Sequence, residues 1–84
     1  MKHFVSSKFW TLYRALPEDV RELADKNYQL LKSNPRHPSL HFKKIGELWS
    51  VRVSDHYRAL GVPEEGDINW IWIGTHAEYD KIIA

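Results

Sequence analysis

The sequence contains no cysteine among its 84 residues. Disulfide bonds, cysteine-ligated zinc and a thiol nucleophile are therefore excluded. Glycine and proline are scarce, at four residues each, and no apolar run approaches the roughly 20 residues that a membrane-spanning helix needs. The first ten residues, MKHFVSSKFW, lack the apolar segment of a signal peptide. These absences favour one folded domain, residues 1–84, in the cytoplasm.

Acidic residues are absent from residues 26–46. The Lys and Arg residues of this stretch are Lys26, Lys32, Arg36, Lys43 and Lys44. Most of the acids lie in residues 18–25 and 64–80, so the net charge is only +1. A basic middle between acidic flanks predicts a local surface for a polyanion. A solvated run of charges without any partner is an equally open interpretation.

The N-terminal half has the pattern of a short strand followed by two helices. Residues 2–5 suit a strand, and Ser6 or Ser7 suits a helix N-cap. The apolar residues then recur at helical spacing: Phe9, Leu12, Tyr13, Leu16, Val20, Leu23, Ala24, Leu30 and Leu31. Pro17 divides this stretch into two helices, and we expect it at the first position of the second one. Asn34-Pro35 ends the helical hairpin.

The second half has the period of β-strands. Strands are predicted at residues 41–45, 48–54, 57–62 and 68–74, the last three as an antiparallel meander. The tail, residues 75–84, has helix-like spacing of its apolar residues. We therefore predict an α+β domain, with the N-terminal helical hairpin packed on one face of a small antiparallel sheet. The other face is expected to stay open for a ligand.

Strand alternation selects the side chains that reach this open face. In 48–54, Trp49, Val51 and Val53 suit the core, which leaves Arg52 on the other side. Arg58 shares a face with apolar residues of its own strand. Its guanidinium could bind a phosphate through two donors, or it could instead reach solvent or pair with an acid.

Four further residues have both a functional and a structural interpretation. Lys43 and Lys44 are adjacent in a strand, so at most one points into the site, and both could simply protect an exposed edge. His76 follows a strand end and could move protons near neutral pH, with Tyr79 on the same side of a helical tail. In isolation, His76 could equally be a turn residue and Tyr79 tail packing. Trp70 and Trp72 alternate with Ile71 and Ile73, so one set is expected in the core.

The order of a helical hairpin, LHFKKIGELWSVRVSDHYRALGV, a short acidic loop and WIWIGTHAEYDKII resembles the RelE/ParE superfamily of type II toxin–antitoxin toxins. It is most similar to small RelE-like or HigB-like members. The resemblance is strongest over residues 40–83. It implies a toxin that is neutralised by a cognate antitoxin.

Ribosome-dependent members of the family cleave mRNA in the ribosomal A site and inhibit translation without a metal or other cofactor. The resemblance places Arg58 at the strand Arg that stabilises the transition state, and His76 at the general base or acid. Tyr79 matches a C-terminal aromatic that stacks on a base or assists proton transfer. Lys43, Lys44 and Arg52 would hold the RNA backbone.

One departure from the family pattern bears on the activity. Some members carry a further Arg just after the last strand, where this sequence has Thr75-His76-Ala77. Members that poison DNA gyrase share the fold and lack the nuclease residues. The resemblance therefore leaves three possibilities: an endoribonuclease (an mRNA interferase), a non-enzymatic ParE-like gyrase inhibitor, or an inactive relic that still binds an antitoxin.

Overall fold

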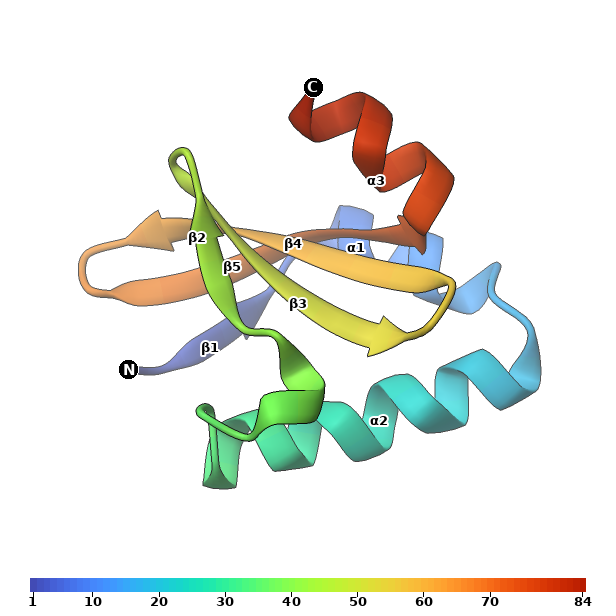
Figure 1. Ribbon diagram of the computed structural model, residues 1–84, viewed down its shortest axis with the longest axis horizontal. Coiled ribbons are helices and arrows are strands. Elements are labelled where there is room, and N and C mark those ends of the chain that lie inside the picture. The colour runs from blue at the N-terminus through green and yellow to red at the C-terminus, as the bar shows by residue number, and fades with distance from the viewer.

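A computed structural model describes all 84 residues as a five-stranded sheet with three α-helices (Figure 1). The helices are α1 (Ser7–Arg14), α2 (Glu18–Ser33) and α3 (His76–Ile83), with a short 3₁₀ helix, η1 (Pro38–Leu40). The strands are β1 (His3–Val5), β2 (Lys43–Ile45), β3 (Leu48–Ser54), β4 (Tyr57–Glu64) and β5 (Asp67–Thr75). None of the helices combines the length and apolar character that crossing a membrane requires. The predicted α+β class is confirmed.

The strand order is β1-β5-β4-β3-β2, and β3, β4 and β5 form the predicted antiparallel meander. The sheet is nevertheless mixed, because β1 runs parallel to β5, with Val5 opposite Trp70. Strands β1 and β5 are far apart in the sequence, so no short turn connects them and dictates whether they run parallel or antiparallel. The strand predicted at 41–45 begins only at Lys43, because His41 has a left-handed conformation (φ 44°) and caps η1.

Helices α1 and α2 cover one face of the sheet, as predicted. Ser6 is the N-cap of α1, and its hydroxyl accepts a hydrogen bond from the Phe9 amide at 3.2 Å. Pro17 is the N-cap of α2, one position before the expected one. The helices and this face of the sheet share one apolar cluster: Leu16, Val20, Leu31, Leu40, Val51, Val53, Ala59, Ile68, Trp70 and Ile73. Leu23 was expected in the same core and is instead 40% exposed.

Helix α3 lies on the opposite side of the sheet from α2 (Figure 1). Its Tyr79 is only 5% exposed, and Leu60 of β4, outside the main cluster, is 1% exposed. The prediction that this face stays open was therefore wrong for the part beneath α3. The spacing of apolar residues in 75–84 predicted a helix there, but so short a pattern did not show which surface the helix would cover.

An irregularity in the pairing of β4 with β5 decides which tryptophan enters the core. Leu60 is opposite Trp72, whereas the next residue, Gly61, is opposite Trp70, so Ile71 is an extra residue in β5. A β-bulge of this kind moves the following side chains to the other face. Trp70 and Ile73 consequently share the helix-covered core, and Trp72 lies with Leu60 on the α3 side. The expected separation of both tryptophans from both isoleucines was wrong.

The bulge predicts a specific effect on stability at Gly61. A Cβ atom there would lie 2.5 Å from Ile68 Cγ2 and 3.0 Å from Trp70 Cε3. Gly61→Ala is therefore expected to lower the free energy of unfolding by about 1–3 kcal/mol, through overpacking of the core. Urea denaturation measures this, with exposed Glu64→Ala in the same strand as the control, expected to change stability by less than about 0.5 kcal/mol. Equal stability of the two variants would contradict this packing.

Candidate functional site

Two arginines lie directly opposite each other on the α3 side of the sheet. Arg52 of β3 pairs with Arg58 of β4, and Arg58 pairs in turn with Gly74 of β5. Cross-strand partners project to the same face, and like charges directly opposite are destabilising. The sequence placed Arg52 on the side away from the core and Arg58 on the face of the apolar residues of its own strand. The structure shows that the two residues are neighbours on one face. An anion bound between them would relieve the repulsion.

Arg58 is held by the main chain and has no acidic partner. Its Nη1 donates to the carbonyl oxygens of Ser54 at 2.6 Å and Tyr57 at 2.9 Å. Burial, followed by the charge of Arg52, lowers the pKa of Arg58, although an arginine remains protonated at neutral pH. The Nη2 and Nε groups stay available. The guanidinium is thus fixed in position with donors free for two oxygens of a phosphate.

Arg52 differs from Arg58 because it already has a partner. Its Nη2 forms an ion pair with Asp55, an exposed residue of the β3–β4 turn, and its Nη1 donates to the Ser39 carbonyl at 3.3 Å. An exposed pair of this kind contributes little to stability. Arg52 can therefore exchange Asp55 for an incoming anion at small cost.

His76 is the first residue of α3 and lies beside the β3–β4 turn. Its amide donates to the His56 carbonyl at 2.7 Å, and Thr75 and Glu78 form a capping box that fixes this end of the helix. Its Nδ1 is 3.0 Å from Oδ2 of Asp80, one turn later, and its side chain is 44% exposed. The imidazole is therefore oriented by a carboxylate while remaining accessible. Asp80 was not singled out from the sequence, although its i, i+4 spacing from His76 was a visible signal.

The side chain of Tyr79 is buried between α3 and the sheet. Its hydroxyl lies 2.8 Å from the hydroxyl of Ser50, which is 2% exposed, and its ring centroid lies 5.7 Å from that of His76. The side chain holds α3 against β3 and offers little ring surface for stacking. Ser50, like Asp80, was not proposed as a site residue. Its position opposite Leu60 places it beneath α3.

The Ser50–Tyr79 contact predicts a measurable loss on substitution. Tyr79→Phe leaves the buried Ser50 hydroxyl without a partner, so the free energy of unfolding is expected to fall by about 1–3 kcal/mol. Chemical denaturation checks this. The double variant Ser50→Ala/Tyr79→Phe removes both hydroxyls and is expected to recover part of the loss. Strictly additive losses would show that the two groups do not interact.

Lys43 and Lys44 are both exposed on the edge strand β2 and point to opposite faces. Lys43 is opposite Ser50, so it shares the face of Arg52 and Arg58. Lys44 is opposite Trp49, and its Nζ lies 5.3 Å from the centre of that indole ring on the other face. Only Lys43 can therefore join the two arginines directly.

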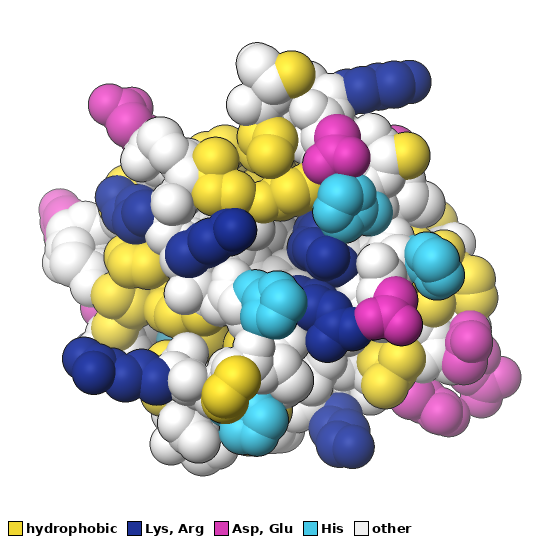
Figure 2. Space-filling model, viewed as in Figure 1, with side chains coloured by type: hydrophobic (Ala, Val, Ile, Leu, Met, Phe, Trp, Pro, Cys, Tyr) yellow, Lys and Arg dark blue, Asp and Glu magenta, His cyan; other side chains and the backbone are white.

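The face that carries these side chains has a basic centre. Figure 2 shows Lys and Arg side chains in its middle, with His side chains around them and a hydrophobic patch towards α3. Asp and Glu side chains lie mainly at the margins of this view. The arrangement suits an anionic ligand that contacts Arg58 and reaches His76.

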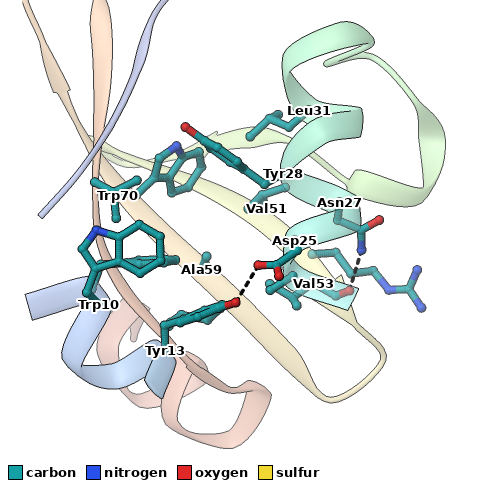
Figure 3. Close-up of a pocket in the computed structure, with 15 residues that line it drawn as sticks. Trp10, Tyr13, Asp25, Asn27, Tyr28, Leu31, Val51, Val53, Ala59 and Trp70 are labelled. Carbon is teal, nitrogen blue, oxygen red and sulfur yellow. Dashed lines mark hydrogen bonds between the residues drawn. The ribbon is translucent and has the colours of Figure 1, made fainter. Parts of the chain in front are cut away.

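A hollow lies on the other face, between the helices and the sheet (Figure 3). Trp10 and Tyr13 of α1 face α2 across it, and the Tyr13 hydroxyl donates to Asp25 at 2.7 Å. This bond raises the pKa of Tyr13. With a volume of about 80 Å³ and mostly apolar walls, the hollow is smaller than typical ligand sites. It belongs to the packing between the helices and the sheet.

Solved toxin structures share this fold. The RelE–RelB toxin–antitoxin complex of Methanococcus jannaschii matches with a TM-score of 0.71 and 14% identity, covering 96% of this chain and 99% of that one. The YoeB/ParE toxin of Agrobacterium tumefaciens matches with a TM-score of 0.67 and 16% identity, over 90% and 99% of the chains. For RelE of E. coli the TM-score is 0.62 at 17% identity, over 99% and 98%. At these identities, the matches show the fold alone.

Sequence comparison gives the family. No curated protein matches the chain. The model of the ParE-like toxin domain matches residues 18–81, which include α2 and every strand except β1. The sequence resemblance to toxins is thereby confirmed, and the chain belongs to the ParE-like toxin domain family, within the RelE/ParE superfamily of toxin–antitoxin toxins.

Proposed function

We propose that this toxin is a metal-independent endoribonuclease that cleaves mRNA on the ribosome and so inhibits translation. The observation that carries the proposal is the cross-strand pair Arg52–Arg58, in which Arg58 is fixed by the main chain and lacks an acidic partner. Two like charges on one sheet face favour an anion between them. A phosphodiester is the anion that a RelE-like toxin would place there.

In the proposed reaction, the 2′-hydroxyl of a nucleotide attacks the adjacent phosphate. A bond forms between the 2′-oxygen and phosphorus while the bond to the 5′-oxygen breaks. Arg58 stabilises the charge that develops on the phosphate oxygens. His76 takes the proton of the 2′-hydroxyl or protonates the leaving 5′-oxygen. The products are a 2′,3′-cyclic phosphate and a 5′-hydroxyl.

The remaining residues divide between binding and support. Arg52 and Lys43 share the face of Arg58 and are proposed to bind backbone phosphates without sequence preference. Lys44 is proposed to contact RNA from the far side of β2. Tyr79, with its hydroxyl on Ser50, is proposed to fix the position of His76, and any direct part in proton transfer would require the Ser50 contact to open.

A cognate antitoxin is the proposed protein partner. The similar RelE of Methanococcus jannaschii is described in complex with the antitoxin RelB. For this chain, an antitoxin helix or strand that covers the basic face would block Arg58 and His76. Acidic side chains in that segment would replace RNA phosphates at Arg52 and Arg58.

The experiment that tests the proposal is induction of the toxin in a bacterium, with growth and new mRNA 5′ ends recorded together. New ends inside translated codons, bearing 5′-hydroxyl groups, are expected within the period of growth arrest. Arrest without new ends would refute RNA cleavage. Growth without arrest would indicate the inactive relic.

A second candidate function is non-enzymatic inhibition of DNA gyrase. The observation that favours it is the description of the matching family model as ParE-like. In that case the basic face contacts protein, mRNA stays intact, and DNA damage accompanies the arrest. The same induction experiment separates the two functions.

A further inference from the structure

A second basic surface lies on the far side of β2 from the Arg52–Arg58 pair. The C-terminal end of α2, the chain before β2, the strand β3 and the N-terminal residues enclose a groove of about 520 Å³. Its lining includes His3, Lys32, Pro35, Arg36, Phe42 and Trp49. Figure 1 shows the N-terminus and the C-terminal end of α2 on the same side of the molecule.

The cations that line this groove, Lys32 and Arg36, and the neighbouring Lys44 have no acidic partners. The ion pairs of the protein are Arg52–Asp55 and His76–Asp80, so Lys32, Arg36 and Lys44 are left unpaired. Burial, then the positive charges of the terminal amine and of Lys32, lower the pKa of His3. The groove therefore carries a local excess of positive charge that a polyanion would neutralise.

Aromatic rings lie among these cations. Phe42 and Trp49 are stacked, with ring centroids 4.7 Å apart and planes 19° apart. Lys44 lies over the Trp49 ring, and the Nζ of Lys32 is 4.7 Å from the centre of the Tyr28 ring. Single-stranded nucleic acids use this combination, since their bases stack on aromatic rings and their phosphates pair with neighbouring cations. An acidic peptide would use the cations but not the rings.

The edge strand β2 connects this groove to the opposite face. Lys43 points to the side of Arg52 and Arg58, whereas Lys44 points to Trp49 and the groove. A chain of phosphates that leaves the arginine pair can therefore cross β2 over two consecutive lysines. The charged positions on both faces then form one continuous path around the edge of the sheet.

We propose that the groove lined by Lys32, Arg36, Phe42 and Trp49, with Lys44 beside it over the Trp49 ring, is a second binding site for single-stranded RNA. It holds nucleotides that flank the segment on the Arg52–Arg58 face. The inference rests on the proposed function in one respect, which is that the RNA is taken to run from the Arg52–Arg58 face across β2 into the groove. The groove is proposed to bind RNA through two kinds of contact. A base stacks on the aromatic rings, and phosphates pair with the three cations.

The test measures binding of uncleavable RNA, so it does not depend on catalysis. Oligonucleotides with 2′-O-methyl groups, of about 4 and about 12 nucleotides, are titrated by fluorescence anisotropy at several salt concentrations. The groove variant is Lys32→Ala/Arg36→Ala/Lys44→Ala. The matched control, Lys8→Ala/Arg14→Ala/Lys26→Ala, removes the same charge from exposed positions outside the groove.

We expect the longer oligonucleotide to bind the wild type and the control more tightly than the shorter one. In the groove variant this advantage is lost, and the slope of log affinity against log salt falls by about 2, for three lost phosphate contacts. An abasic oligonucleotide of equal length is expected to bind the wild type roughly tenfold more weakly, since stacking is removed.

Equal behaviour of the groove variant and the control would overturn the second site. Equal affinity for abasic and normal oligonucleotides would also overturn it, and would leave a general polyanion surface such as one for an acidic peptide. If instead these binding results hold while the wild type cleaves no RNA, the second site stands and the proposed endoribonuclease activity fails.

Discussion

Arg58→Ala is expected to lower the rate of RNA cleavage by about 10²–10³-fold, because it removes a fixed donor from the phosphate at the point where charge develops. Arg58 has no acidic partner, and its hydrogen bonds go to two main-chain carbonyls, those of Ser54 at the end of β3 and Tyr57 at the start of β4. The substitution also removes the repulsion with Arg52. Single-turnover cleavage of mRNA on purified ribosomes measures the effect.

Two further variants separate the role of the Arg58 donors from the effect of losing a positive charge. Arg58→Lys keeps the charge but loses the planar pair of donors, so its rate is expected between those of alanine and wild type. Arg14→Ala on α1 removes an equal charge at an exposed position and is expected to cleave normally. A folded Arg58→Ala protein with wild-type cleavage would refute the proposed role of Arg58.

The sequence predicted the strands and helices well because their signals are local. Alternation in 48–54 and 57–62 also placed Arg52 and Arg58 on faces that the structure confirms. The parallel pairing of β1 with β5 was missed because it depends on contacts between the ends of the chain. The bulge at Ile71 was missed because an extra residue leaves the apolar pattern of INWIWIG unchanged.

The site itself was predictable in its types of residue but not in its contacts. His76 and Tyr79 were selected for chemistry and spacing, whereas the burial of Tyr79 on Ser50 depends on where α3 packs. Residues 43 and 44 were known to point apart, but which of them faces the arginines follows from the register with β3. Register and helix packing are tertiary properties that one sequence does not reveal by pattern alone.

His76→Ala is the second substitution with a large expected effect. Loss of the general base or acid is expected to lower cleavage by about 10²–10⁴-fold and to abolish growth arrest on induction. His76 is 44% exposed and its side chain contacts Asp80 and Tyr79 of its own helix, so the stability of the fold is expected to change little. Thermal unfolding of the variant provides the control.

Toxicity of His76→Ala also separates the two candidate functions. A gyrase inhibitor needs the shape and charge of its surface, not a proton-transferring imidazole, so the variant would still arrest growth and damage DNA. Asp80→Asn sharpens the comparison, because it removes the carboxylate beside Nδ1 and retains the imidazole of His76. For an endoribonuclease, Asp80→Asn should slow cleavage, since it removes the carboxylate that orients the His76 ring. Undiminished toxicity of both variants, with intact mRNA, would assign the arrest to a protein target.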